Sequence, residues 1–203
     1  MEFADVVRRR RMVRSYTDEP VDPAAVERIL AHALRAPSAG FSQGWAFLLL
    51  DDPLPVAAFW RATTPPDEDH DEEEDAWFAG MSKAPVIVVP LAHKEAYLSR
   101  YAEADKGWTD RDDNSWPVPY WLIDTGMASF LMLLTAVDEG LGACFFGIPP
   151  GRTNVLRDAF GIPGDHEPIG AVAIGHPAPG GVAGSAATRR RRRIDEVVHR
   201  GQW

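Results

Sequence analysis

The chain has 203 residues, of which 45% are hydrophobic and 25% charged, and it carries a net charge of −9 at pH 7. These values are typical of a globular protein that buries a sizeable core. Its single cysteine, Cys144, excludes an intramolecular disulfide, and the start MEFADVVRRRR lacks the apolar stretch of a signal peptide. Uninterrupted apolar runs such as residues 85–92 are too short to cross a bilayer, so we expect a cytoplasmic protein that has no membrane partner.

Most of the negative charge comes from one tract, residues 67–75, which holds eight acids in nine positions. The rest of the chain is nearly neutral, so the acidity is local. We expect the tract to be a solvated loop or an acidic surface helix. His70 within it is a weak candidate for loose binding of a divalent ion. The six histidines together show no ligand-like spacing, so no metal site is predicted.

Arginine is concentrated near both ends of the chain. Five arginines lie among residues 8–14, and an unbroken run of five occupies residues 189–193. A guanidinium group donates paired hydrogen bonds to phosphate oxygens, so nucleic acid and a small phosphate ligand held from two sides are both candidate partners. A basic run at the end of a helix is also commonly a solvated cap that favours the helix dipole.

The first elements in chain order are helices. Residues 2–11 predict a short helix that ends in the first arginine cluster. Asp22 followed by Pro23 is typical of a helix start, and the apolar spacing behind it is that of an amphipathic helix. That helix should end near Ala36, because Pro37 disfavours the α region for the residue before it.

The remaining elements alternate between strands and helices. Residues 120–139 predict the longest helix, which is apolar on nearly all sides and therefore central in the core or buried in a subunit interface. This alternation indicates an α/β or α+β layered fold. The other predicted segments are a loop at 37–44, strands at 46–50, 85–91, 143–148 and 169–174, helices at 53–62 and 153–160, an irregular excursion at 106–119 and an extended linker at 176–188.

Two further segments are rich in small residues. In APSAGFSQGW, residues 36–45, the backbone can approach a flat ligand closely, although an ordinary helix-to-strand loop is the simpler interpretation. In GLGACFFGIP, residues 140–149, glycines flank a buried strand. Cys144 in that strand has no neighbouring histidine or acid, so we interpret it as a small buried hydrophobe and not as a nucleophile.

Taken together and in order, these segments resemble the nitroreductase family of flavoproteins. The matching stretches are RRMVRSYTDEPV, APSAGFSQGWAFLLL, PYWLIDTGMASFLMLLTAVDEGLGACFFGIP and the end DEVVHRGQW with the basic run before it. The resemblance implies an α+β three-layer fold, with a central mainly antiparallel sheet flanked by helices, in a domain-swapped-type homodimer. Residues 1–203 would form one such domain, with 64–80 and 106–119 as variable or lid insertions and 176–203 as a C-terminal extension.

The resemblance also implies one FMN in each of two pockets at the subunit interface. The first basic motif would hold the FMN phosphate and ribityl chain, the small-residue loop the flavin edge, partly from the partner subunit, and the C-terminal run the phosphate again. The backbone of Phe146 would lie near the flavin N5, where an N–H group stabilises the reduced flavin. The implied cofactor-binding residues are Arg10, Arg11, Met12, Arg14, Pro37, Ser38, Ala39, Gly40, Phe41, Phe145, Phe146, Gly147, Arg190 and Arg192.

The sequence departs from the family pattern at two of these positions and at the neighbouring Gly44. The family usually has a small polar residue at Met12, and many members have asparagine at Phe41 and proline at Gly44. At Met12, only the backbone or the shape of the side chain is available to the ligand. The departures leave the cofactor and substrate specificity open.

The implied reaction takes place on the flavin and needs no catalytic side chain. Hydride would pass from NAD(P)H through flavin N5 to a flat acceptor, a nitroaromatic, quinone or enone, by a ping-pong mechanism. Trp77, Trp108 and Trp116 would form a lid or pack as satellite aromatics. The alternatives are a flavin- or deazaflavin-binding, flavin-fragmenting or flavin-storage protein of the same fold and, more distantly, a nucleic-acid-binding module that uses the arginine clusters. The pI near 5.1 and the lack of a recognition motif argue against nucleic acid.

Overall fold

The structure, a computed structural model, describes residues 1–65, 72–108, 111–181 and 188–203. At its centre is a five-stranded sheet with the order β1-β2-β5-β3, and the short β4 pairs with β2. Every pairing between the named strands is antiparallel. The strands are β1 (Trp45–Leu50), β2 (Val86–Ala92), β3 (Gly142–Phe146), β4 (Glu167–Pro168) and β5 (Ala171–Gly175).

Strand β2 lies in the middle of the sheet because its sequence, VIVVPLA, is apolar throughout. All seven of its residues are buried. Ile87 and Val89 face one side of the sheet, and Val86 and Val88 face the other, as the period of two along a strand requires. The two faces therefore each carry a separate hydrophobic cluster.

One face is covered by α2 (Pro23–Ala33) and α6 (Tyr120–Asp138). Asp22 begins α2 as expected, since its Oδ1 accepts a 2.9 Å hydrogen bond from the backbone N–H of Ala24. Small residues on α6, Ala128 and Ala136, are fully buried and let it approach the sheet closely. Ile29 of α2 packs in the same cluster.

The other face is covered by α3 (Pro53–Thr63), α4 (Glu72–Met81) and α7 (Thr153–Phe160). Phe59 from α3, Met81 from α4 and Leu156 from α7 are completely buried in the second cluster. Helices therefore lie on both sides of one antiparallel sheet, which confirms the α+β three-layer prediction.

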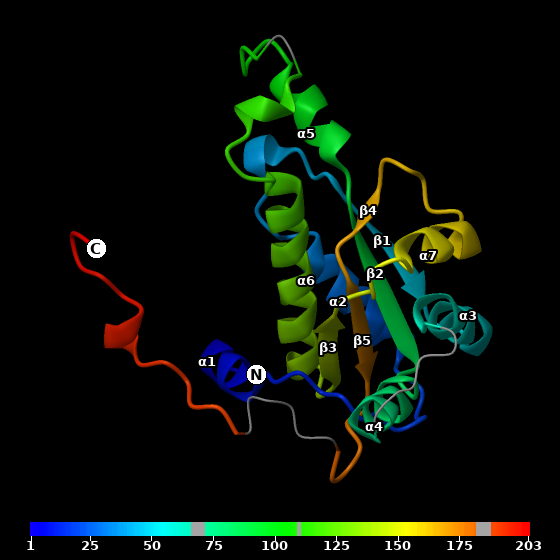
Figure 1. The fold of residues 1–203 in the computed structure, drawn as a ribbon. Helices are drawn as coiled ribbons and strands as arrows, with labels where there is room; N and C mark the ends of the chain where they lie inside the picture. The colour runs from blue at the N-terminus through cyan, green and yellow to red at the C-terminus, as the bar shows by residue number, and fades with distance from the viewer. Residues whose placement is uncertain (66–71, 109–110, 182–187) are drawn as a thin grey trace.

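The remaining elements lie at opposite ends of the molecule. Helix α1 (Phe3–Arg9) lies near the C-terminal end of α6, and α5 (Lys94–Tyr101) lies near the N-terminal end of α6 (Figure 1). Within the described residues, short 3₁₀ turns lie at Ala39–Phe41, Asp113–Ser115 and Ile194–Glu196. The described tail, residues 188–203, extends away from the sheet and its helices (Figure 1).

The predicted elements exist with ends shifted by a few residues, and two elements were missed. The first helix covers residues 3–9 instead of 2–11, and the second ends at Ala33, ahead of the predicted Ala36. The described residues of the segment from 106 to 119, which are 106–108 and 111–119, are irregular apart from one short 3₁₀ turn, as expected. Part of the acidic tract forms α4, whereas residues 66–71, with His70, and residues 182–187 of the expected linker lie outside the described residues. The missed elements are α5 and β4.

Among the described residues, α6 is the one helix that is long and apolar enough to span a membrane, judged by length and composition alone. A core helix of a globular protein meets the same test. Since α6 packs against the sheet and 50% of its apolar window is buried, this finding is weak evidence for a membrane span.

Candidate cofactor site

The first basic segment lies against the outer edge of β3. Met12 forms a parallel bridge with Ala143, and the backbone N–H of Val13 donates a 3.1 Å hydrogen bond to the carbonyl of Ala143. Gly142 permits this approach, because a Cβ at that position would meet the Val13 side chain at 2.8 Å. The two segments singled out in the sequence, residues 10–14 and 140–149, are thus side by side.

Three arginines of this segment carry no carboxylate partner among the described residues. Arg10 and Arg14 are half-buried and Arg11 is exposed. Arg14 Nη1 lies 3.4 Å from the carbonyl of Met12, which is at most a weak hydrogen bond. In the same segment Arg8 does pair with Asp5. Arg10, Arg11 and Arg14 therefore present guanidinium groups that are available to an anion.

The outer edge of β3 also offers backbone N–H groups beyond the Met12 bridge. Since the carbonyl of Ala143 points outward to Val13, the alternation along an antiparallel strand directs the N–H of Phe145 to the same edge and that of Phe146 toward β5. The Phe146 side chain stacks on Trp60, with ring centroids 5.5 Å apart and an interplanar angle of 5°. Gly147, just past the strand, is exposed.

The small-residue loop, residues 37–41, is held in an unusual backbone conformation. Gly40 has φ +61°, and a Cβ there would come within 2.6 Å of the Tyr101 ring. Phe41 has φ 56°, an uncommon value for a bulky residue, and its side chain is 74% exposed. A costly backbone conformation that presents an exposed ring is a feature expected of a contact site.

Three polar side chains that the sequence analysis did not single out hold this loop in place. The carboxylate of Asp124, on α6, accepts a 2.8 Å hydrogen bond from the backbone N–H of Ala39 and a 2.9 Å hydrogen bond from the Tyr97 hydroxyl. Arg100 Nε donates a 3.0 Å hydrogen bond to the carbonyl of Gly40. An acid near the start of a largely apolar helix is the sequence signal by which Asp124 could have been found.

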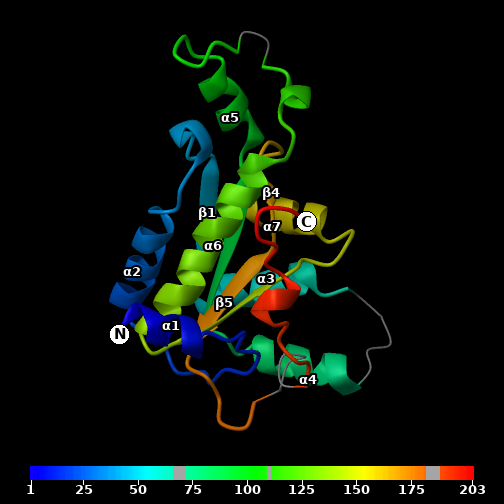
Figure 2. The same cartoon turned by 90° about the vertical axis from the view of Figure 1, so that its left-hand side faces the viewer.

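Within one chain, the loop and the basic segment lie at opposite ends of α6. The loop contacts Asp124 near the start of the helix, whereas Met12 bridges β3 just after the helix ends. A helix of 19 residues spans about 28 Å. Figure 2 shows the same separation from a second side, with α1 and α5 at opposite ends of α6. One chain alone therefore does not bring residues 37–41 to Arg10, Arg11 and Arg14.

The C-terminal arginines make contacts inside their own tail. Arg190 pairs with Glu196 at 2.7 Å, and Arg192 donates a 2.6 Å hydrogen bond to the carbonyl of Glu196. The hydrogen bond from Arg190, followed by one from the backbone N–H of Arg193, holds the pKa of the Glu196 carboxyl below its usual value. Both arginines are exposed, and the tail that carries them lies apart from the Arg10–Arg14 segment of the same chain (Figure 1).

The three tryptophans of the expected lid belong to two different clusters. Trp116 packs against Trp108 and Tyr101 near the loop, with ring centroids 5.4 and 4.5 Å away. Trp77 packs against Trp60 and Phe146 instead, on the α3 face of the sheet. Only Trp108 and Trp116 are therefore placed to form one aromatic cover.

The buried thiol of Cys144 is unsuited to nucleophilic chemistry. The residue is 2% exposed, and burial raises the pKa of its thiol. The thiolate, the reactive form, is thus disfavoured, which agrees with the interpretation of Cys144 as a core residue.

Comparisons with known proteins identify the family of the chain. The sequence profile of the Nitroreductase family matches residues 7–176, so the chain belongs to the nitroreductase family. It is 30% identical over 198 residues to a protein of Thermus thermophilus named NADH dehydrogenase, with 85% of each chain covered. It is 27% identical over 179 residues to an assigned NADH dehydrogenase/NAD(P)H nitroreductase of Archaeoglobus fulgidus, with 87% of this chain and 86% of that protein covered.

Solved structures show the same fold. A nitroreductase family protein from Clostridium difficile superposes with a TM-score of 0.73 at 21% identity, and each chain is covered completely. A second structure is that of a protein from Exiguobacterium sibiricum, assigned as a nitroreductase and crystallised in complex with FMN. It superposes with a TM-score of 0.71 at 19% identity, and the alignment covers 98% of this chain and 97% of that protein. Family and fold together support an oxidoreductase that uses a flavin.

Proposed function

We propose that the protein is an FMN-dependent oxidoreductase that transfers hydride from NAD(P)H to a flat electrophilic acceptor such as a nitroaromatic, quinone or enone. The proposal rests on three guanidinium groups that have no carboxylate partner among the described residues. They belong to Arg10, Arg11 and Arg14, beside the outer edge of β3 in a chain of this family. Bound FMN would supply the hydride chemistry at its isoalloxazine ring.

The basic segment fits the phosphate of such a cofactor. Arg14 and Arg10 are half-buried, and a partly shielded guanidinium binds an anion more strongly than a fully solvated one does. Met12 has no polar side-chain hydrogen to donate, so its part is confined to the backbone and to packing. Arg190 and Arg192 reach the phosphate only if they exchange their contacts with Glu196 for it.

The outer edge of β3 fits the rim of a flat ring. The N–H of Phe145 faces that edge, and the N–H of the exposed Gly147 continues the same alternation two residues on, whereas that of Phe146 faces β5. In the proposal, the backbone from Phe145 to Gly147 lies beside the flavin, and the outward N–H groups are its donors.

The site requires two chains. Pro37, Ser38, Ala39, Gly40 and Phe41 lie at the end of α6 remote from the basic segment, so in the proposal they serve the cofactor of the partner subunit. The exposed apolar side chains of α6 favour the same homodimer, since Ile123 is 42% and Phe130 48% exposed in a single chain. The tail, whose Trp203 is 99% exposed, would pack on the partner.

The test is a measurement on purified protein. We expect a yellow dimer with flavin absorbance that bleaches on anaerobic addition of NADH or NADPH and recovers when a quinone or nitroaromatic is added. Bleaching by a reduced deazaflavin alone would reassign the donor, and bound flavin that no donor reduces would indicate a flavin-binding protein without reductase activity. A colourless protein that binds DNA would contradict the proposal.

A further inference from the structure

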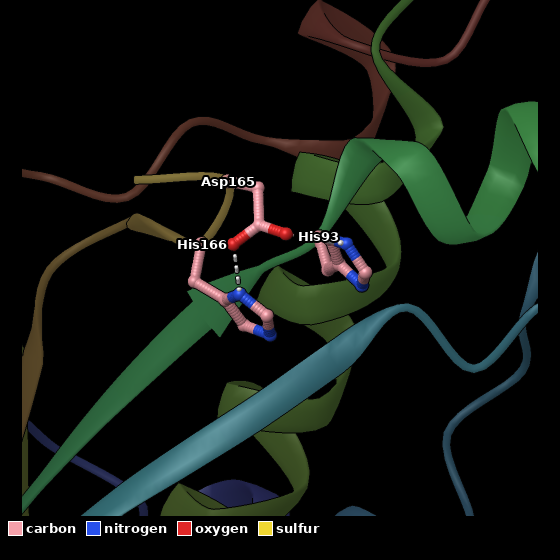
Figure 3. Close-up of side chains that lie close together, drawn as sticks. All are labelled: His93, Asp165 and His166. Atoms are coloured by element: carbon pink, nitrogen blue, oxygen red, sulfur yellow. Dashed lines mark hydrogen bonds and ion pairs between the residues drawn. The ribbon is translucent and has the colours of Figure 1, made fainter. Parts of the chain in front are cut away.

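A cluster of two imidazoles and one carboxylate lies at the junction of β2 and α5, outside the proposed cofactor site. His93 directly follows β2, and Asp165 and His166 directly precede β4. Figure 3 shows the three side chains converging from these two segments. Their candidate ligand atoms all lie within 4.8 Å of one another.

The strand register creates this cluster. Because Ala92 pairs with Glu167 in the antiparallel ladder of β2 and β4, His93 and His166 stand opposite each other on adjacent strands. The backbone of His93 is fixed on its other side as well, where its N–H donates a 2.9 Å hydrogen bond to the carbonyl of Gly44. Because 72 residues separate the two histidines along the chain, their sequence spacing does not indicate that the side chains lie together.

The contacts within the cluster leave one nitrogen poorly satisfied. The two rings stack with centroids 4.4 Å apart and an interplanar angle of 14°. Asp165 accepts a 2.8 Å hydrogen bond from His166 Nδ1, which holds the pKa of the carboxyl below its usual value. Nε2 of His93 is shielded from solvent, lies 3.3 Å from the other oxygen of Asp165 and has no aligned hydrogen bond in the described structure.

We propose that His93, Asp165 and His166 bind a divalent transition-metal ion of the Zn²⁺ class. Two imidazole nitrogens and a carboxylate oxygen are the ligand set that Zn²⁺ and its neighbours favour, and the open positions would be taken by water. Ligands of a tetrahedral Zn²⁺ lie about 3.3 Å apart. An imidazole nitrogen binds a metal in the plane of its ring, so the two nearly parallel rings must turn relative to each other to point at one ion. Asp165, whose side chain is 58% exposed, leaves the cluster open to solvent.

The cluster lies at the start of α5, so a bound ion would affect how that helix is held. His93 begins α5, the helix whose Tyr97 and Arg100 hold the loop at residues 38–41. An ion bound by His93 and His166 would fasten the start of that helix to the segment before β4. In this proposal the ion stabilises the end of the molecule that carries Trp108 and Trp116.

The experiment is a titration of the purified full chain with Zn²⁺ after chelator treatment, followed by calorimetry, and with Co²⁺ as a visible-absorption probe. We expect one ion per chain and a rise in the melting temperature. His166→Ala and Asp165→Asn should each weaken binding at least about tenfold. His93→Gln, which retains the bulk of the side chain, should do the same.

Two control variants test whether other histidines of the chain bind the ion. His176→Ala removes an imidazole whose partner is one glutamate, Glu19, at 4.0 Å. His70→Ala removes the histidine of the acidic tract, which lies outside the described residues. Neither should change the affinity for Zn²⁺. Binding that survives His166→Ala and Asp165→Asn, binding that His70→Ala removes, or no binding of one ion per chain would overturn the proposal.

Discussion

The hydroxyl of Tyr97 donates a 2.9 Å hydrogen bond to the carboxylate of Asp124, which is 1% exposed. Burial is the main cause that raises the pKa of Tyr97, so the phenol stays protonated and remains a donor. The bond joins α5 to α6, and the same carboxylate oxygen holds the backbone of Ala39. A buried carboxylate thus couples two helices and the small-residue loop.

Tyr97→Phe should destabilise the protein, because it leaves Asp124 with only the Ala39 donor in the described structure. A buried acceptor that loses a partner costs about 1–3 kcal/mol in the free energy of unfolding. Urea denaturation measures the difference. Tyr101→Phe is the matched control, since no hydrogen bond of the Tyr101 hydroxyl is found in the described structure, and an equal loss in both variants would contradict the assignment.

Arg14→Ala should weaken FMN binding by about 1.5–3 kcal/mol, the usual value of a charge-assisted hydrogen bond, which corresponds to roughly 10- to 150-fold. Flavin fluorescence on serial dilution of the protein gives the dissociation constant. Arg8→Ala, in the same segment but paired with Asp5, should leave it unchanged. If Arg192→Ala adds no further loss to that of Arg14→Ala, the C-terminal run does not share the phosphate.

Gly40→Ala should destabilise the loop for two reasons, its φ of +61° and the 2.6 Å approach of a Cβ to the Tyr101 ring. The positive φ alone costs about 1 kcal/mol and the clash adds to it. Gly107→Ala isolates the first cause, because Gly107 has φ +74° and no neighbour within 4 Å of a Cβ. Denaturation midpoints of the two variants are compared, and equal shifts would show that the ring moves aside freely.

The ion pair between Arg28 and Glu139 should make stability depend on pH. Two hydrogen bonds of 2.7 Å join the pair, and they are the main cause that lowers the pKa of Glu139 below 4.5. A lowered pKa in the folded state adds stability above the unfolded value, and this stability is lost as the pH falls through the folded value. Glu139→Gln should therefore be less stable than the parent protein at pH 7, with the gap closing below about pH 4. Glu27→Gln, at an exposed position of α2 with no ion pair in the described structure, is the matched control, and an equal loss of stability at pH 7 in both variants would contradict the assignment.

Much of the fold could be predicted from local signals. Asp22 and Pro23 marked the start of α2, and the apolar sequence of β2 indicated a strand buried on both faces. Helix α5 could not be found in this way, because its sequence, KEAYLSRY, is short, mostly polar and only weakly amphipathic. The two-residue strand β4 owes its existence to pairing with β2, a contact between distant parts of the chain.

The candidate site was predictable only in part. The family resemblance pointed to Arg10, Arg14 and the loop at residues 37–41, and the contact of the basic segment with β3 places two of the predicted segments together. Which N–H of β3 faces outward depends on the register with β5 and with Val13, which the sequence does not reveal. The grouping of His93 with His166 depends on the same kind of long-range register.

The placement of the loop and the basic segment at opposite ends of α6 has a genetic consequence. If each cofactor is held by the arginines of one chain and the loop of the other, two differently damaged chains can rescue each other. Co-expression of an Arg14→Ala chain with a Gly40→Ala chain would give mixed dimers with one doubly damaged site and one intact site. Such a dimer, isolated through two different tags, should retain one tightly bound flavin. If each site were built from a single chain, both sites of the mixed dimer would be damaged.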